Sequence, residues 1–174
     1  SIINYLIKLS KASLDEESRE TVDALFNTVN DIERIGDHAE NIAELGKDIK
    51  DSEISFSDVG LVELKDMYNK VVSTYTYALE AMRTSNVDLA CKVIKMEEQV
   101  DMMEKSCRAN HMNRLNGSSC SIESGVIYLG IVSNLERVSD HCSNIAGCVI
   151  DMTTKKLNIH ESLREFRNYS NDYK

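Results

Sequence analysis

Apolar residues recur at spacings of three and four along most of this chain, which predicts long amphipathic helices. The clearest stripe follows Ser13-Leu14-Asp15-Glu16, which matches the S-x-x-E capping box found at helix starts. It continues to about residue 50 with only Gly36 and Gly46 as interruptions, so a helix of roughly 50 Å is expected. The stripe consists of Val22, Leu25, Val29, Ile32, Ile35, Ala39, Ile42 and Ile49.

The remaining segments predict the other helices of an all-α bundle, because short turns join them. Residues 2–11 resemble the end of a helix, and further helices are expected over about 57–84, from Asn86 to the Asn116-Gly117 pair, over about 121–153, and from about residue 158. The side chains expected to point inward from the 57–84 helix are Val62, Tyr68, Val71, Val72, Tyr75, Leu79 and Met82. Those expected to point inward from the following helix are Leu89, Val93, Met96, Val100, Met103 and Cys107.

Composition narrows the class of protein. The 174 residues are 42% hydrophobic and include no proline, which suits an ordered helical domain. A net charge of −9 without any Lys/Arg cluster argues against a nucleic-acid partner. Five cysteines without a C-x-x-C spacing indicate neither a disulfide framework nor a zinc knuckle, and no apolar run is long enough to cross a membrane. The chain opens inside a helical pattern without methionine, which suggests a piece of a longer protein.

An internal repeat lies at an offset of 103 residues, where 29–43 matches 132–146. The polar positions are kept as well as the apolar ones, which a duplicated packing face alone does not require. The repeat therefore predicts two equivalent structural units and a duplicated polar function. The identical pairs are Val29 with Val132, Glu33 with Glu136, Arg34 with Arg137, Asp37 with Asp140, His38 with His141, Asn41 with Asn144, Ile42 with Ile145 and Ala43 with Ala146.

Carboxylates spaced four residues apart recur within and beside this repeat. Two like charges at this spacing destabilise a helix slightly, whereas a cation held between them reverses that effect. In an antiparallel bundle the helix before the second motif can bring its own carboxylate pair to the same place, which predicts a metal site of four carboxylates. The pairs are Glu33 with Asp37, Glu136 with Asp140, and Glu97 with Asp101.

The doubled motif Leu/Ile-Glu-Arg-Ile/Val-x-Asp-His-x-x-Asn-Ile-Ala resembles the signature of PhoU proteins, which are regulators of phosphate uptake. The resemblance extends over nearly the whole chain, to residue 153. It implies an all-α fold of two pseudo-repeated three-helix bundles, with the first repeat truncated at its N-terminus. Residues 1–84 would hold the partial first repeat and the start of the second, 57–153 the second repeat, and 154–174 a tail helix.

The resemblance also implies a multinuclear metal site of iron or zinc, with other divalent transition metals as alternatives. In PhoU proteins, E(D)xxxD motifs hold these clusters on the bundle surface. Three of the pairs in this chain match such motifs, and Glu33/Asp37 would form only a half-site because its partner helix is missing. The implied metal ligands are Glu97, Asp101, Glu136, Asp140, Glu33 and Asp37.

Residues 158–166 and Tyr173 are similar to the tail that follows the PhoU-like domain of bacterial sodium/phosphate cotransporter family proteins. This similarity implies a non-enzymatic regulatory domain on the cytoplasmic face of the inner membrane. Its partners would be the membrane transport module of the same chain and inorganic phosphate.

Three alternatives stay open. One is a free-standing PhoU-type regulator of phosphate signalling, and another is a structural bundle without metal. The third is a carboxylate di-iron enzyme, which is disfavoured because none of the four histidines follows a glutamate in the Glu-x-x-His spacing.

Residues beside the motifs have two interpretations each. His38 and His141 are metal ligands or hydrogen-bond a carboxylate, and Asn41 and Asn144 are auxiliary ligands or ordinary polar residues. Arg34 and Arg137 neutralise the carboxylates or face solvent. The truncated first repeat is expected to expose apolar surface that a homodimer would cover. That surface is expected around Ile2, Ile3, Leu6, Val29 and Ile35.

Overall fold

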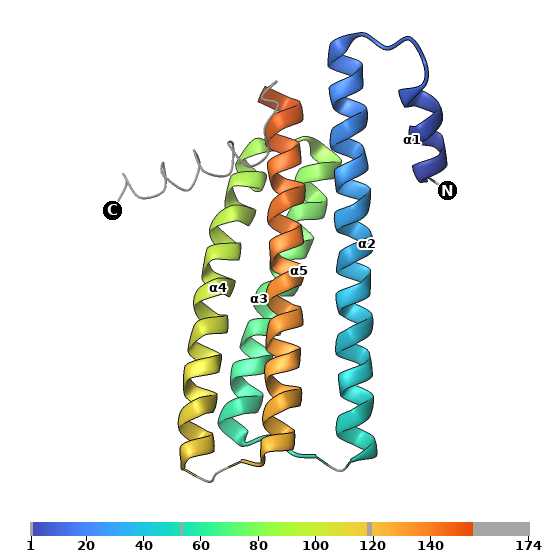
Figure 1. Ribbon diagram of the computed structural model, residues 1–174. Helices are drawn as coiled ribbons and strands as arrows, with labels where there is room; N and C mark the ends of the chain where they lie inside the picture. The colour runs from blue at the N-terminus through green and yellow to red at the C-terminus, as the bar shows by residue number, and fades with distance from the viewer. Residues whose placement is uncertain (1, 53, 118–119, 155–174) are drawn as a thin grey trace.

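The computed structural model describes residues 2–52, 54–117 and 120–154, and within these ranges it is helical with no strand (Figure 1). The predicted all-α class is therefore confirmed. The predicted helix from residue 158 lies outside the described residues. The helices are α1 (Ile2–Ser10), α2 (Glu16–Asp51), α3 (Asp58–Thr84), α4 (Val87–Asn116) and α5 (Ile122–Thr154).

Helices α3, α4 and α5 form a three-helix bundle in which each contacts the other two. Helix α2 lies antiparallel along α5, and α1 folds back onto α2 (Figure 1). In Figure 1 the helices lie side by side, with α4 and α1 on opposite sides and the pair α2 and α5 between them. The predicted fold of a complete second repeat beside a truncated first one is thus confirmed.

Side chains and glycine fix the helix ends. Asn86 accepts a hydrogen bond from the Leu89 amide at 3.0 Å, and the Gly117 amide donates to Asn113, as the sequence predicted for the two ends of α4. The capping box predicted at Ser13 is wrong. Asp15 is the N-cap of α2, where its carboxylate accepts from the Ser18 amide at 2.8 Å, and these hydrogen bonds lower the pKa of Asp15. Asp15 is a better cap than Ser13 because its negative charge also interacts favourably with the positive end of the helix dipole.

The hydrophobic core lies between α3, α4 and α5. The stripe predicted for α4 is confirmed, because Val93, Met96, Val100 and Cys107 are buried. Tyr128 and Val132 of α5 are buried against it. Helix α2 contributes fewer fully buried residues, because among the described helices it contacts only α1 and α5.

The inward face predicted for α3 is largely wrong. Val71 is buried and Met82 is half-buried, but the large apolar side chains Val62, Tyr68, Val72, Tyr75 and Leu79 are exposed. The face that α3 turns to the core carries mostly smaller residues, which let its backbone approach its neighbours closely. At Gly60, for example, a Cβ atom would meet Ser57 Oγ at 3.3 Å and the Tyr128 ring at 3.4 Å. The buried face is Gly60, Met67, Val71, Thr74, Ala78 and Ala81.

Apolar surface is exposed at the truncated repeat, at Ile2, Tyr5, Ile7 and Ile32, but most of the residues named for it are at least half-buried. Ile2 is exposed, but Leu6 is buried because α1 folds back onto α2. Ile3, Val29 and Ile35 are half-buried. Among the described residues, none of the helices combines the length and apolarity needed to cross a membrane.

Candidate metal centre

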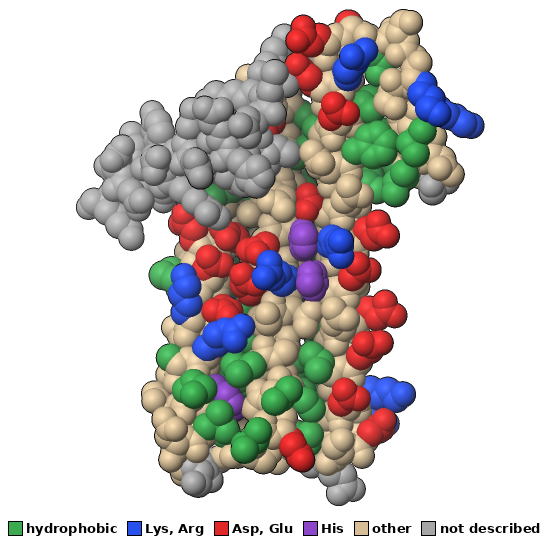
Figure 2. Space-filling view, in the orientation of Figure 1, with side chains coloured by type: hydrophobic (Ala, Val, Ile, Leu, Met, Phe, Trp, Pro, Cys, Tyr) green, Lys and Arg blue, Asp and Glu red, His purple; other side chains and the backbone are tan. Residues whose placement is uncertain are grey.

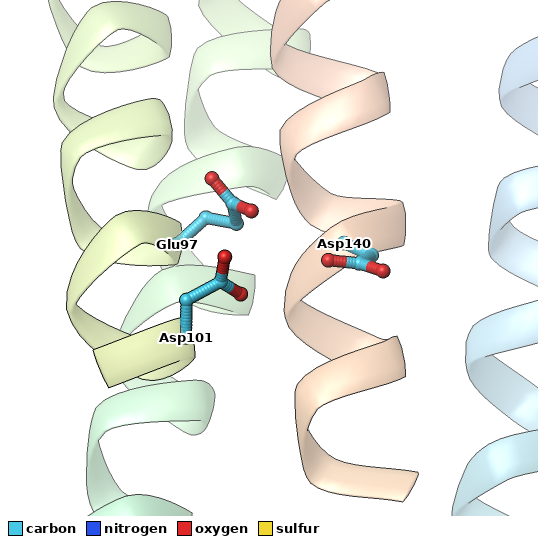
Figure 3. Close-up of side chains that lie close together, drawn as sticks. All are labelled: Glu97, Asp101 and Asp140. Carbon is cyan, nitrogen blue, oxygen red and sulfur yellow. The ribbon is translucent and has the colours of Figure 1, made fainter. Parts of the chain in front are cut away.

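Three carboxylates from two helices converge at the α4–α5 contact (Figure 3). Glu97 and Asp101 come from α4 and Asp140 from α5, and one oxygen of each lies within 4.8 Å of the others. Glu97 is only 3% exposed, and the two aspartates are half-buried. The structure therefore brings together three of the four residues predicted for the site of the second repeat.

The local sequence explains this arrangement. Glu97 and Asp101 are one helical turn apart, and Glu97 sits within the buried stripe of α4 between Met96 and Val100. A carboxylate in that position loses solvation, and nearby acidic groups add repulsion. A proton or a cation shared among the three oxygens relieves both costs, and carboxylate oxygens are ligands for hard and borderline metal ions.

Glu136, the fourth predicted residue, lies one turn before Asp140 on α5 but outside the set of three. Its pKa is raised, first by burial and then by the negative charge of Asp140, with further contributions from Asp101 and Glu104. Arg137 opposes that rise. Glu136 therefore shares the electrostatic field of the cluster, so a cation bound there would stabilise its ionised form.

The arginine of each motif lies beside its carboxylates. Arg137 approaches Glu136 at 3.6 Å and Asp140 at 3.9 Å, and Arg34 approaches Asp37 at 3.8 Å. Both guanidinium groups are mostly exposed, so water screens these pairs and each contributes little to stability. The arginines therefore neutralise only part of the negative charge of the carboxylates.

The first repeat presents its pair differently. Glu33 and Asp37 are exposed on α2, and the one cluster of three or more potential metal ligands found among the described residues contains neither. The described helices place no counterpart of Glu97 and Asp101 beside them. The half-site expected from the sequence is thus an isolated acidic pair.

The histidine and asparagine of each motif join the two repeats, which the sequence did not predict. The alternative that the histidines hydrogen-bond a carboxylate is confirmed for His141, whereas His38 contacts an amide oxygen. His141 Nδ1 lies 2.8 Å from Asp31 Oδ1, and the Asn144 amide donates to the same oxygen at 3.1 Å. In the mirrored arrangement, His38 Nδ1 lies 2.8 Å from Asn134 Oδ1, and Asn41 donates to that oxygen at 3.3 Å. We call these six residues the inter-repeat clasp.

The clasp has the symmetry of the repeat. Adding 103 to Asp31, His38 and Asn41 gives Asn134, His141 and Asn144, so each motif donates to the acceptor of the other. The rings of His38 and His141 stack across the centre with centroids 5.6 Å apart. Figure 2 shows two histidine side chains close together near the middle of this face, with basic and acidic side chains around them. The duplicated acceptor position seven residues before each histidine is the signal that could have revealed the clasp.

A second polar cluster, also missed from the sequence, ties together the three helices of the complete bundle. Glu63 of α3 accepts hydrogen bonds from Tyr128 at 2.6 Å and from Asn110 and Arg114 at 2.8 Å each. These donors lower the pKa of Glu63 against the opposing effect of burial. Burial and the bond to Glu63 raise the pKa of Tyr128. Arg114 neutralises the charge of Glu63 within the cluster, and the shared hydrogen bonds hold α3, α4 and α5 together.

The fold and the site define a duplicated α-helical bundle with an acidic cluster in its complete repeat. The chain matches the PhoU domain family over residues 1–46 and 64–149, and it belongs to that family. The resemblance inferred from the doubled motif is therefore confirmed at the level of the family.

Known proteins agree with this assignment. The chain is 38% identical over 135 residues to the phosphate-specific transport system accessory protein PhoU homolog 1 of Thermotoga maritima, covering 78% of this chain and 57% of that protein. The crystal structure of PhoU from Pseudomonas aeruginosa matches the fold with a TM-score of 0.83 at 24% identity, over 88% of this chain and 73% of that one. A putative inorganic phosphate export protein of Salmonella typhimurium is 24% identical over 153 residues, covering 84% of this chain and 27% of that protein. The chain thus spans little more than half the length of its Thermotoga relative.

Proposed function

We propose that this chain is a PhoU-type regulatory domain that acts in phosphate transport and binds a transition-metal ion at the Glu97, Asp101 and Asp140 cluster. The observation that carries the metal site is the convergence of these three carboxylates within 4.8 Å, with Glu97 almost fully buried. The observation that carries the role in phosphate transport is the 38% identity to an accessory protein of a phosphate-specific transport system.

Iron or zinc is the metal that the resemblance to PhoU proteins implies, and carboxylate oxygens can bind either ion. Glu97, Asp101 and Asp140 supply oxygen ligands from two helices, and Glu136 is close enough in the field to add a fourth or to bind a second ion. A metal ion held by only three protein ligands keeps a coordination position open, where an oxygen of inorganic phosphate can replace water. In this proposal the domain acts by binding and carries out no catalytic step.

Metal content tests the site. The double variant Glu136→Gln with Asp140→Asn keeps side-chain size and removes two negative charges, and we expect it to lose the metal found in the wild-type protein. The matched control is Glu33→Gln with Asp37→Asn, the same changes at the equivalent positions of the first repeat, and it should keep the metal. Elemental analysis of protein purified without chelator gives the measurement.

Circular dichroism should show equal helix content in all three proteins, since the changed residues lie beside the core. Negligible metal in the wild type, even after loading with iron or zinc, would refute the metal site. Titration calorimetry with inorganic phosphate, before and after metal loading, then tests the phosphate contact, which we expect only in the loaded wild type.

The relatives favour a PhoU-type accessory protein over the transporter domain first expected from the sequence. A covalent link to a membrane module is a second candidate, favoured by the match to 27% of the phosphate export protein. The gene sequence upstream of Ser1 distinguishes the two, because the transporter domain requires membrane-spanning segments there. A free-standing accessory protein would have no membrane-spanning segment there.

A further inference from the structure

A small polar cavity lies where α3 and α5 begin and α4 ends, at the lower end of the bundle in Figure 1. Its volume is about 10 Å³. That is roughly the space that one water molecule needs. We call it the end cavity, and the residues that line it include Ser57, Gly60, His111, Arg114, Ser124 and Tyr128.

Two buried nitrogen atoms belong to the side chains that line the end cavity. His111 is only 2% exposed, and the Arg114 side chain is 13% exposed. Among the described residues, neither His111 Nε2 nor Arg114 Nη2 has a hydrogen-bond partner. Buried polar groups in folded proteins are nearly always paired, because an unpaired one loses its hydration without compensation. These two atoms therefore indicate a bound partner.

Neighbouring side chains hold both groups in place. The His111 ring stacks on Tyr128 with centroids 5.0 Å apart, and the Tyr128 hydroxyl donates to Glu63 at 2.6 Å. Arg114 Nη1 donates to the same carboxylate at 2.8 Å. Turning either side chain away from the end cavity would disturb this cluster, so the unpaired nitrogen atoms are fixed parts of the fold.

We propose that the end cavity binds one water molecule, which pairs with Arg114 Nη2 and His111 Nε2. A guanidinium group only donates hydrogen bonds, so its partner must accept one. Burial and the positive charge of Arg114 lower the pKa of His111, so its ring is neutral at physiological pH. The Nε2 atom of a neutral imidazole either donates or accepts, depending on the tautomer, and water can do both.

The charges and the size of the end cavity exclude other ligands. A metal cation would be repelled by Arg114, and the charge of Arg114 is already neutralised by Glu63. An anion would therefore add a buried charge without a partner, which is costly. A larger organic molecule exceeds the volume. Ser57 Oγ and Ser124 Oγ, which also line the end cavity, offer the further hydrogen bonds that a buried water makes.

Two glycines keep the space open. A Cβ atom at Gly60 would lie 3.6 Å from Arg114 Nη2 and 3.3 Å from Ser57 Oγ, and one at Gly125 would lie 2.5 Å from His111 Nε2. A side chain at either position would thus take the place of a ligand beside these nitrogen atoms. The bound water extends the hydrogen-bond cluster of Glu63 to the first turns of α3 and α5.

Nuclear magnetic resonance tests the proposal on the wild-type chain. Nuclear Overhauser effects between water and the ring protons of His111 should have the sign of a water that stays bound for longer than the tumbling of bulk water. Magnetic relaxation dispersion of the water signal should then lose the contribution of one long-lived water in His111→Phe, which keeps the stacked ring but removes the nitrogen atoms. Gly60→Ala should lose the same contribution, because its methyl group fills the space beside Arg114.

The matched control is Gly46→Ala on α2, where a Cβ atom meets nothing within 4 Å, and its dispersion should equal that of the wild type. Circular dichroism should show equal helix content in all variants, and the Overhauser effects of the wild type decide the matter even if a variant fails to fold. Three results would each overturn the proposal. They are a wild type without water contacts at His111, equal dispersion in the wild type and both cavity variants, and His111 signals that shift when bromide replaces sulfate, which would identify an anion.

Discussion

The two copies of the repeated motif have nearly the same residues but different surroundings. On α5, Asp140 converges with two carboxylates of α4 and Glu136 lies in their electrostatic field, whereas on α2, Glu33 and Asp37 are exposed without such a partner among the described residues. The same contrast holds for packing, because Leu135 is 4% exposed and its equivalent Ile32 is 49% exposed. The acidic pair of a motif thus becomes part of a larger carboxylate cluster only when a neighbouring helix supplies further carboxylates.

The clasp shows the opposite behaviour. His38 and His141, with their asparagines, make equivalent hydrogen bonds although only one repeat is complete. The reason is that the clasp needs only α2 and α5, which are both present and in contact. The repeat therefore encodes two things at once: a carboxylate pair that depends on a third helix, and an amide–imidazole pair that depends on the other copy.

The largest expected difference between the repeats concerns the core. Leu135→Ala should lower the free energy of unfolding by about 2–5 kcal/mol, because it leaves a cavity among buried neighbours. Ile32→Ala should cost less than about 1 kcal/mol, because half of that side chain already contacts water. Urea unfolding followed by circular dichroism gives both values. Equal costs would mean that the exposed face of α2 is covered in solution.

Metal binding should also distinguish the acidic pair of the second repeat from that of the first. Zinc at about 100 times its Kd should stabilise the wild-type protein by about 2.7 kcal/mol, because a ligand that binds only the folded state shifts the unfolding equilibrium. Glu97→Gln should abolish this stabilisation, and Glu33→Gln should leave it unchanged. Thermal unfolding with and without zinc provides the measurement, and a chelator should return the wild type to its metal-free midpoint. If Glu33→Gln also loses the stabilisation by zinc, the ion binds at the first repeat and the proposed site is wrong.

The two halves of the clasp should differ by a smaller amount. Asp31→Ala removes a carboxylate that accepts from His141 and Asn144, and it should cost about 1–3 kcal/mol by leaving two half-buried donors without their partner. Asn134→Ala removes a neutral acceptor at the equivalent position and should cost about 1 kcal/mol. Chemical unfolding measures both. Asp31→Asn, which makes the two halves alike, should fall between wild type and Asp31→Ala.

The smallest expected effect is the pH dependence of the acidic cluster without metal. Because the pKa of Glu136 is raised in the folded state, folding binds a proton there, and stability falls as the pH rises from the ordinary value of 4.5 through the folded-state value. Glu136→Gln removes this fall, so the variant should gain about 0.2–0.5 kcal/mol over wild type near neutral pH, the size of one like-charge pair on a helix. Unfolding midpoints from pH 4 to 8 test it, with Glu33→Gln as the control. A variant that gains most at low pH would contradict the assignment.

Local patterns were enough to place the helices. The spacing of apolar residues, the absence of proline and the cap at Asn86 fix where the chain is helical, since these depend on neighbours within one or two turns. The offset of 103 residues also indicated the repeat and its acidic pairs before any contact was known. Glu97 and Asp101 could be placed near Asp140 because antiparallel neighbours in a bundle bring consecutive helices together.

The faces of the helices depended on the packing of the whole chain. On α3 most of the larger apolar residues point outward, because close contact with α4 and α5 favours small side chains such as Ala78 and Thr74 on the inner face. A prediction that places the largest apolar side chains in the core therefore selects the wrong face of α3. The role of His38 and His141 depended likewise on the contact of α2 with α5, which joins residues about a hundred positions apart. Periodicity within a helix carries no information about which neighbour will lie on which side, so these features required the tertiary arrangement.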